Sequence, residues 1–149
     1  MIRCLVLAVV ALAALPQASQ AQTVAFRTVV KGDGLSSSIP RQSVTIRGER
    51  RWTKLWETLG EAGEVPEVDF RRHMLIAVTQ GRQPSGGHAI RVRRIVRTGD
   101  TWVVSVVETE PSPGCPSTGV ITSPYHVVRV PRSSRTVTFE RTVTERSCR

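Results

Sequence analysis

The sequence lacks the short motifs that mark most catalytic and metal centres. It contains neither the G-x-S-x-G of a nucleophile elbow nor the H-E-x-x-H of a zinc site. Its three histidines, His73, His88 and His126, stand in three different segments, and no paired Cys/His spacing accompanies them. We therefore expect no metal ion, no cofactor and no enzymatic activity.

Lysine is almost absent, since Lys31 and Lys54 are the only two, yet arginine gives the chain a formal net charge of +9. Aromatic residues make up only 5% of the chain, and the arginines are scattered over many segments. A single-strand nucleic-acid binder would instead interleave basic and aromatic residues along one stripe, so we expect no nucleic-acid partner. The charge itself fits either a solvated arginine-rich surface or attraction to an anionic polymer or acidic partner.

No apolar run is long enough to cross a membrane, which takes about 20 apolar residues. The longest run, Leu5–Leu15, is followed by the small residues Ser19 and Ala21. This pattern predicts a secretory signal peptide over residues 1–21, and hence a protein exported to the periplasm or the cell exterior. Cys4 precedes the apolar run, so it does not occupy the position of a lipid-attachment cysteine.

Cysteine is also scarce, and only Cys115 and Cys148 would remain after cleavage of the signal peptide. An oxidising compartment and an even count favour one disulfide between them, with two free thiols as the alternative. On the chain-entropy model, a bridge of this loop length would stabilise the fold by roughly 3 to 4 kcal/mol.

One helix is predicted over residues 49–59. Trp52, Leu55, Trp56 and Leu59 recur at spacing 0, 3, 4 and 7, which places them on one face, and Gly60 supplies the stop. A pair of tryptophans could form an exposed ligand platform, but the leucines that complete the same stripe favour core packing.

The remaining pattern predicts strands. They are expected at 23–30, 43–47, 74–79, 89–96, 102–107, 125–130 and 136–143. The phase slip at Arg93–Arg94 indicates a β-bulge inside a long hairpin. In the last strand we expect Val137, Phe139 and Val143 to face inward. The fold predicted is α+β, a single domain built as an antiparallel β-sheet meander with one amphipathic helix packed on it. Its expected divisions are residues 1–21 (signal peptide), 22–42 (N-terminal strand and loop) and 43–149 (main domain).

The segment from Gly81 to His88, here called the Gly81 corner, interrupts two strand-like runs with three glycines and a proline. Glycine tolerates positive φ and proline fixes φ, so this composition specifies a particular bend. Its G-x-x-x-x-G spacing is not a P-loop, because Gly87–His88 stands where Lys-Ser/Thr should follow. The hairpin after it returns the chain to the same end of the sheet, so we expect the corner to meet the loop at 110–123.

Three segments in this order resemble the PrcB C-terminal domain family: Gly81–Gly87, Pro111–Cys115 and Thr122–Pro131. The helix with Trp56 and the following Val68–Phe70 are similar to the upstream part of that family, so the likeness covers about residues 43–139. The family is named for an accessory lipoprotein that associates with a subtilisin-like bacterial surface protease. The resemblance therefore implies a binding role, with a protease or other envelope protein as partner. This chain departs from the family pattern in the order of Arg82 and Gln83, in Ser85 and in His88.

We predict an exported, non-enzymatic binding module. Its candidate contact residues are Arg82, Gln83, Pro84, Ser85, Gly86, Gly87, His88, Pro124 and Tyr125. The alternative for these residues is that they only shape the sheet corner, with Tyr125 in the core. Two other functions stay open, an electrostatic binder of anionic polymer and a hydrolase. The hydrolase would need groups to converge from Ser85, His88, Glu108, Glu110, Ser123 and His126. The oligomeric state is not predicted.

Overall fold

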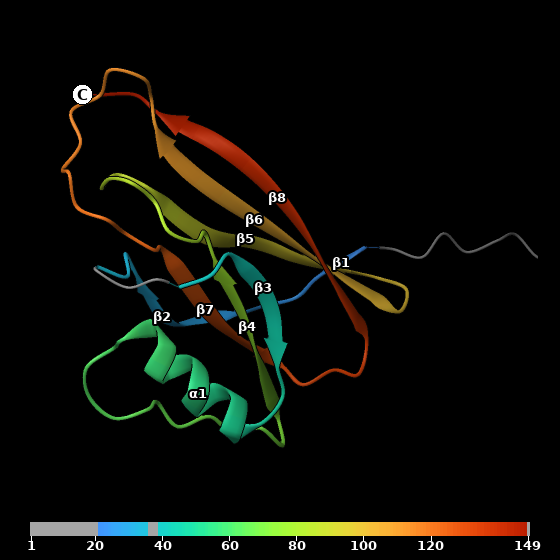
Figure 1. Cartoon of the computed structure of the whole chain (residues 1–149). Coiled ribbons are helices and arrows are strands. Elements are labelled where there is room, and N and C mark those ends of the chain that lie inside the picture. The colour runs from blue at the N-terminus through green and yellow to red at the C-terminus, as the bar shows by residue number, and fades with distance from the viewer. Residues whose placement is uncertain (1–20, 36–38, 149) are drawn as a thin grey trace, which may run out of the picture.

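The computed structural model describes residues 21–35 and 39–148, so residues 1–20 of the expected signal peptide lie outside the described part. One helix and two four-stranded sheets make up the fold (Figure 1). The elements in chain order are β1 (Gln22–Thr23), β2 (Arg27–Gly32), β3 (Gln42–Ile46), α1 (Glu49–Leu59), β4 (His73–Thr79), β5 (Ala89–Thr98), β6 (Thr101–Pro111), β7 (Tyr125–Pro131) and β8 (Thr136–Arg146).

The two sheets, A and B, divide the strands differently from a single meander. Sheet A has the order β1-β5-β6-β8 and sheet B has the order β2-β7-β4-β3. The chain crosses from B to A between β4 and β5, and from A to B between β6 and β7. Because β7 lies in the other sheet, β8 returns beside β6 in the same direction, and this pair is parallel. The α+β class is correct, but the antiparallel meander is wrong.

The central strands are apolar on both faces because each face meets a different core. Met74, Ile76 and Val78 of β4 face a cluster shared with sheet A, whereas Leu75 and Ala77 face a cluster shared with the helix. The long apolar run at this point of the sequence is thus a fully buried strand, as its composition indicates.

Helix α1 covers the face of sheet B that lies away from sheet A (Figure 1). Its bounds and its four buried residues, Trp52, Leu55, Trp56 and Leu59, confirm the prediction. Gly60 ends the helix in the left-handed conformation, with φ 69°. No helix within residues 21–35 and 39–148 is long and apolar enough to cross a membrane.

Other sequence predictions are confirmed or corrected by the strands. The β5–β6 hairpin forms, and its register shifts between Val92 and Arg94, which confirms the bulge. The expected strand at 23–30 is instead two strands, β1 in sheet A and β2 in sheet B. Val143 is 54% exposed, which corrects its inward, buried assignment, because the apolar core stops at Phe139 while β8 continues. The expected boundary between residues 22–42 and 43–149 stays a prediction.

Candidate binding surface

The Gly81 corner is the crossing from sheet B to sheet A. It begins where Gln80 N–H donates to Pro124 C=O at 2.9 Å. Gly81 then takes φ 82°, and a Cβ at this position would lie 3.0 Å from Cβ of Arg41. Both the left-handed conformation and the close approach require glycine here.

The corner meets the 110–123 loop, as the sequence predicts. Gln83 and Thr122 exchange two backbone hydrogen bonds, of 2.7 and 3.1 Å. Gly86 N–H donates to Thr118 C=O at 2.9 Å, and the Thr122 hydroxyl donates to Ser85 C=O at 3.0 Å. β6 extends to Pro111, so the irregular part of the loop starts at residue 112. The Gly81 corner and the 110–123 loop, which are the two crossings between the sheets, therefore lie together and form one surface.

Two further glycines let the chain segments approach each other. A Cβ on Gly86 would collide with the hydroxyl oxygen of Thr118. Gly87 has φ 89°, and a Cβ there would lie 3.1 Å from a guanidinium nitrogen of Arg146. These residues build the corner itself, and they bring the ends of β5, β6 and β8 together.

The side chains of the corner differ in what they offer to a partner. Arg82 and Pro84 are exposed, whereas Gln83, Ser85 and His88 are half-buried. The Gln83 amide turns back to the Gln80 carbonyl at 3.2 Å. Arg82 and Pro84 are thus the side chains that stand clear of the corner.

Pro124 and Tyr125 do not lie on this surface. Both are buried, and Tyr125, at 3% exposure, packs in the helix-side core. Its hydroxyl group lies against Gly32, where a Cβ would collide with it. Their assignment as contact residues is corrected, because the β7 register turns the Tyr125 side chain toward α1.

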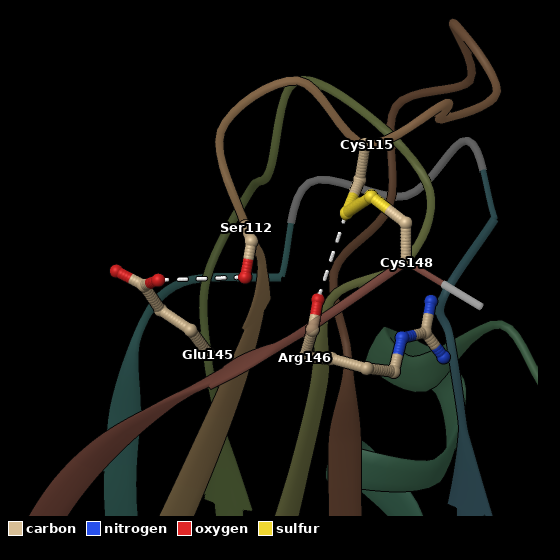
Figure 2. Close-up of a disulfide and its surroundings, with 5 residues drawn as sticks. All are labelled: Ser112, Cys115, Glu145, Arg146 and Cys148. Atoms are coloured by element: carbon tan, nitrogen blue, oxygen red, sulfur yellow. Dashed lines mark hydrogen bonds between the residues drawn. A yellow bond between two sulfur atoms is a disulfide. The ribbon is translucent and has the colours of Figure 1, made fainter.

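The expected disulfide joins Cys115 to Cys148, with 5.4 Å between the Cα atoms. Figure 2 shows that it fastens the loop over the end of β8. Ser112 N–H donates to Arg146 C=O at 3.1 Å, so the loop is also anchored where β6 ends. Beside the bridge lies an open hollow of about 670 Å³, which sequence reasoning missed; its lining includes Pro111, Cys115, Pro116, Glu145, Arg146 and Cys148.

A buried charge cluster near the corner was also missed. The Glu108 side chain is 2% exposed and forms ion pairs with Arg41, at 2.9 Å, and with Arg141. Arg141 also donates to the Thr79 and Gln42 carbonyls in sheet B. The signal in sequence is weak, a lone arginine at an inward position of β8, between Phe139 and Val143.

His126 connects the two sheets from a buried position. Val92 N–H donates to its Nδ1 at 2.9 Å, so the ring proton resides on Nε2, which lies 2.9 Å from the Thr28 hydroxyl. Burial, and then the positive charge of Lys31, lower the pKa of His126 to about 4. Both ring nitrogens are engaged and the ring is neutral at physiological pH.

The described residues hold no group of three or more His, Cys, Asp or Glu side chains placed to bind a metal ion.

Comparison with known proteins gives one relationship. No curated protein and no solved structure matches the chain. The model of the family described as PrcB C-terminal matches residues 74–131. This stretch runs from β4 to β7 and contains both crossings that form the candidate surface. Over residues 74–131, the chain is thus similar to the PrcB C-terminal family.

Proposed function

We propose that this protein is an exported, non-enzymatic accessory module that binds a protein of the cell envelope, such as a protease. The observation that carries the proposal is the joining of the Gly81 corner to the 110–123 loop by backbone hydrogen bonds. Both segments lie in the region that matches the family model, and the resemblance to this family implies an accessory role beside a protease.

The surface is suited to binding because its backbone is held in place before a partner arrives. Three glycines fit tightly against neighbouring segments, and the disulfide restrains the loop from the other side. Less conformational entropy is then lost on association. Arg82 is the exposed side chain of the type enriched at binding hot spots.

Three of the six groups that a hydrolase would draw on are buried or engaged in other contacts. Both nitrogens of His126 have hydrogen-bond partners, Glu108 is held by two arginines, and Ser123 is fully buried. A general base must be free to accept a proton near the substrate. These contacts support a binding role over a catalytic one.

The signal-peptide pattern of residues 1–21 supports export, and the disulfide is compatible with an oxidising compartment. The envelope is therefore where the partner should be sought.

The test begins with capture of the partner from envelope extract, its identification by mass spectrometry, and its purification. We expect Arg82→Ala and Pro84→Ala to weaken binding of the purified partner about tenfold or more, with unchanged melting temperature. Arg50→Ala, an exposed arginine on α1, is the matched control and should bind normally. Unchanged affinity in both corner variants would leave the corner as scaffold only.

A second candidate function rests on three arginines of β5. Arg91, Arg93 and Arg94 are exposed, and within residues 21–35 and 39–148 their side chains have no ion-pair partner. The bulge turns Arg93 and Arg94 outward together. If they bind an anionic polymer, the logarithm of the binding constant for heparin should fall linearly with the logarithm of the salt concentration, and the affinity should drop in the triple alanine variant. Weak, unsaturable retention would oppose this function.

A further inference from the structure

The outer edge of β8 carries unpaired backbone groups along its whole length. Thr136–Arg146 pairs with β6 throughout without a register shift, and no strand in the described part of the chain pairs with its other side (Figure 1). The strand contains no proline, glycine or lysine and no bulge. A long, regular edge without these protective features is a template for another strand.

The hydrogen bonds at both ends of β8 show which residues face this free edge. Thr136 N–H donates to Asp100 C=O, and Arg146 C=O accepts from Ser112 N–H. The backbone groups of even-numbered residues of β8 therefore point toward β6. Successive residues of a strand direct their backbone groups to opposite sides. The N–H and C=O groups of Arg141, Val143 and Glu145 therefore point outward.

The sequence of this edge is complementary to itself. Residues 140–146 read E-R-T-V-T-E-R, so that reversal about Val143 places each glutamate opposite an arginine. We infer that β8 pairs antiparallel with β8 of a second copy of this chain, with a two-fold axis at Val143. Such an interface is isologous and closes as a dimer.

Three kinds of pair in this register are favourable, whereas Arg141, opposite Glu145, is already held by Glu108 and adds little. Val143 meets Val143 of the second copy in a hydrogen-bonded pair, which covers a large apolar side chain that is 54% exposed. Thr142 meets Thr144 and Glu140 meets Arg146 in the closer, non-hydrogen-bonded pairs, where side chains interact most strongly. All four of these polar residues are exposed.

The small area that one strand pair buries limits the affinity of the dimer. One added strand pair buries less than the roughly 1,200 Å² typical of stable interfaces, so the association should be concentration-dependent. A shift of the two β8 strands by one residue in either direction would place outward side chains opposite inward ones. Only registers that differ by an even number of residues can therefore compete with this one.

The first test is Val143→Pro, measured by sedimentation velocity of the purified protein at rising concentration. The wild type should shift from monomer to dimer. Proline removes an N–H that faces the free edge, not the ladder to β6, so the variant should stay monomeric with a nearly unchanged melting temperature. Thr142→Pro removes an N–H that faces β6 and should lower the melting temperature. A monomeric wild type at all concentrations, or a Val143→Pro variant that dimerises like the wild type, overturns the inference.

The second test uses charge. Glu140→Arg and Arg146→Glu each place like charges opposite one another twice per dimer, and each should weaken dimerisation about tenfold. The double variant Glu140→Arg/Arg146→Glu restores opposite charges and should dimerise again. Absence of this rescue, with both single variants folded, contradicts the register.

Discussion

At the scale of single residues, His126 shows how a buried polar group connects the sheets. It lies on β7, accepts a hydrogen bond from β5 and contacts β2. β1 covers β5 only near residues 95–97, so Val92 N–H is free to donate to the ring. A protonated ring would lose this acceptor, because both nitrogens would then carry hydrogen. These contacts give His126 a structural role between the two sheets.

His126 makes the protein sensitive to acid. Its folded pKa of about 4 lies below the ordinary 6.5, so the unfolded state binds the proton more tightly. Its contribution to stability is full above pH 6.5 and is lost as pH falls toward 4, by at most about 3 kcal/mol. Urea unfolding between pH 4 and 7 measures this slope, and His126→Gln, which cannot titrate, should flatten it. An equally steep slope in His126→Gln would assign the effect to other groups.

At the scale of elements, the helix could be predicted from sequence because its signal is local. The i, i+3, i+4, i+7 stripe fixes the buried face, and the structure places Trp52 and Trp56 edge to face, with ring centroids 5.5 Å apart. Trp52 also donates from Nε1 to Pro66 C=O at 2.8 Å, which anchors the loop after the helix.

Removal of the second tryptophan tests this packing. We expect Trp56→Ala to destabilise the protein by about 3 to 5 kcal/mol, because a cavity opens beneath the helix. The urea midpoint should fall while the m-value stays constant, and Arg50→Ala on the exposed face is the control. An unchanged midpoint in Trp56→Ala would mean that α1 contributes little to the core.

Which strands pair with one another, in contrast, cannot be predicted from the local sequence pattern. Alternation placed β8 correctly but could not reveal that β7 lies in the other sheet, which makes the β6–β8 pair parallel. The Gly81 corner could be predicted because three glycines and a proline within eight residues favour a specific bend. The burial of Tyr125 could only be given as an alternative to a contact role, since the choice between core and surface depended on which face of β7 meets α1.

At the scale of the whole molecule, arginine side chains bridge segments that the backbone leaves apart. Arg47 donates to Ser133 C=O at 3.2 Å, Arg132 donates to Phe70 C=O at 2.6 Å, and Arg141 reaches sheet B from β8. A planar guanidinium with several donors can satisfy separate carbonyls at once, which an ammonium group does less well. Part of the arginine excess is therefore structural, a use that net charge alone could not indicate.

The Glu108–Arg141 pair provides the test at this scale. Arg141→Met should cost about 3 to 5 kcal/mol, because it leaves Glu108 buried without its inner partner and the Gln42 carbonyl without a donor. The double variant Glu108→Leu/Arg141→Met removes both charges and should recover much of that loss, keeping only the cost of the unpaired carbonyls. Urea unfolding of the wild type, both single variants and the double variant gives the coupling energy between the two side chains. Additive losses would show that Glu108 and Arg141 stabilise the fold independently, which would contradict the expected coupling.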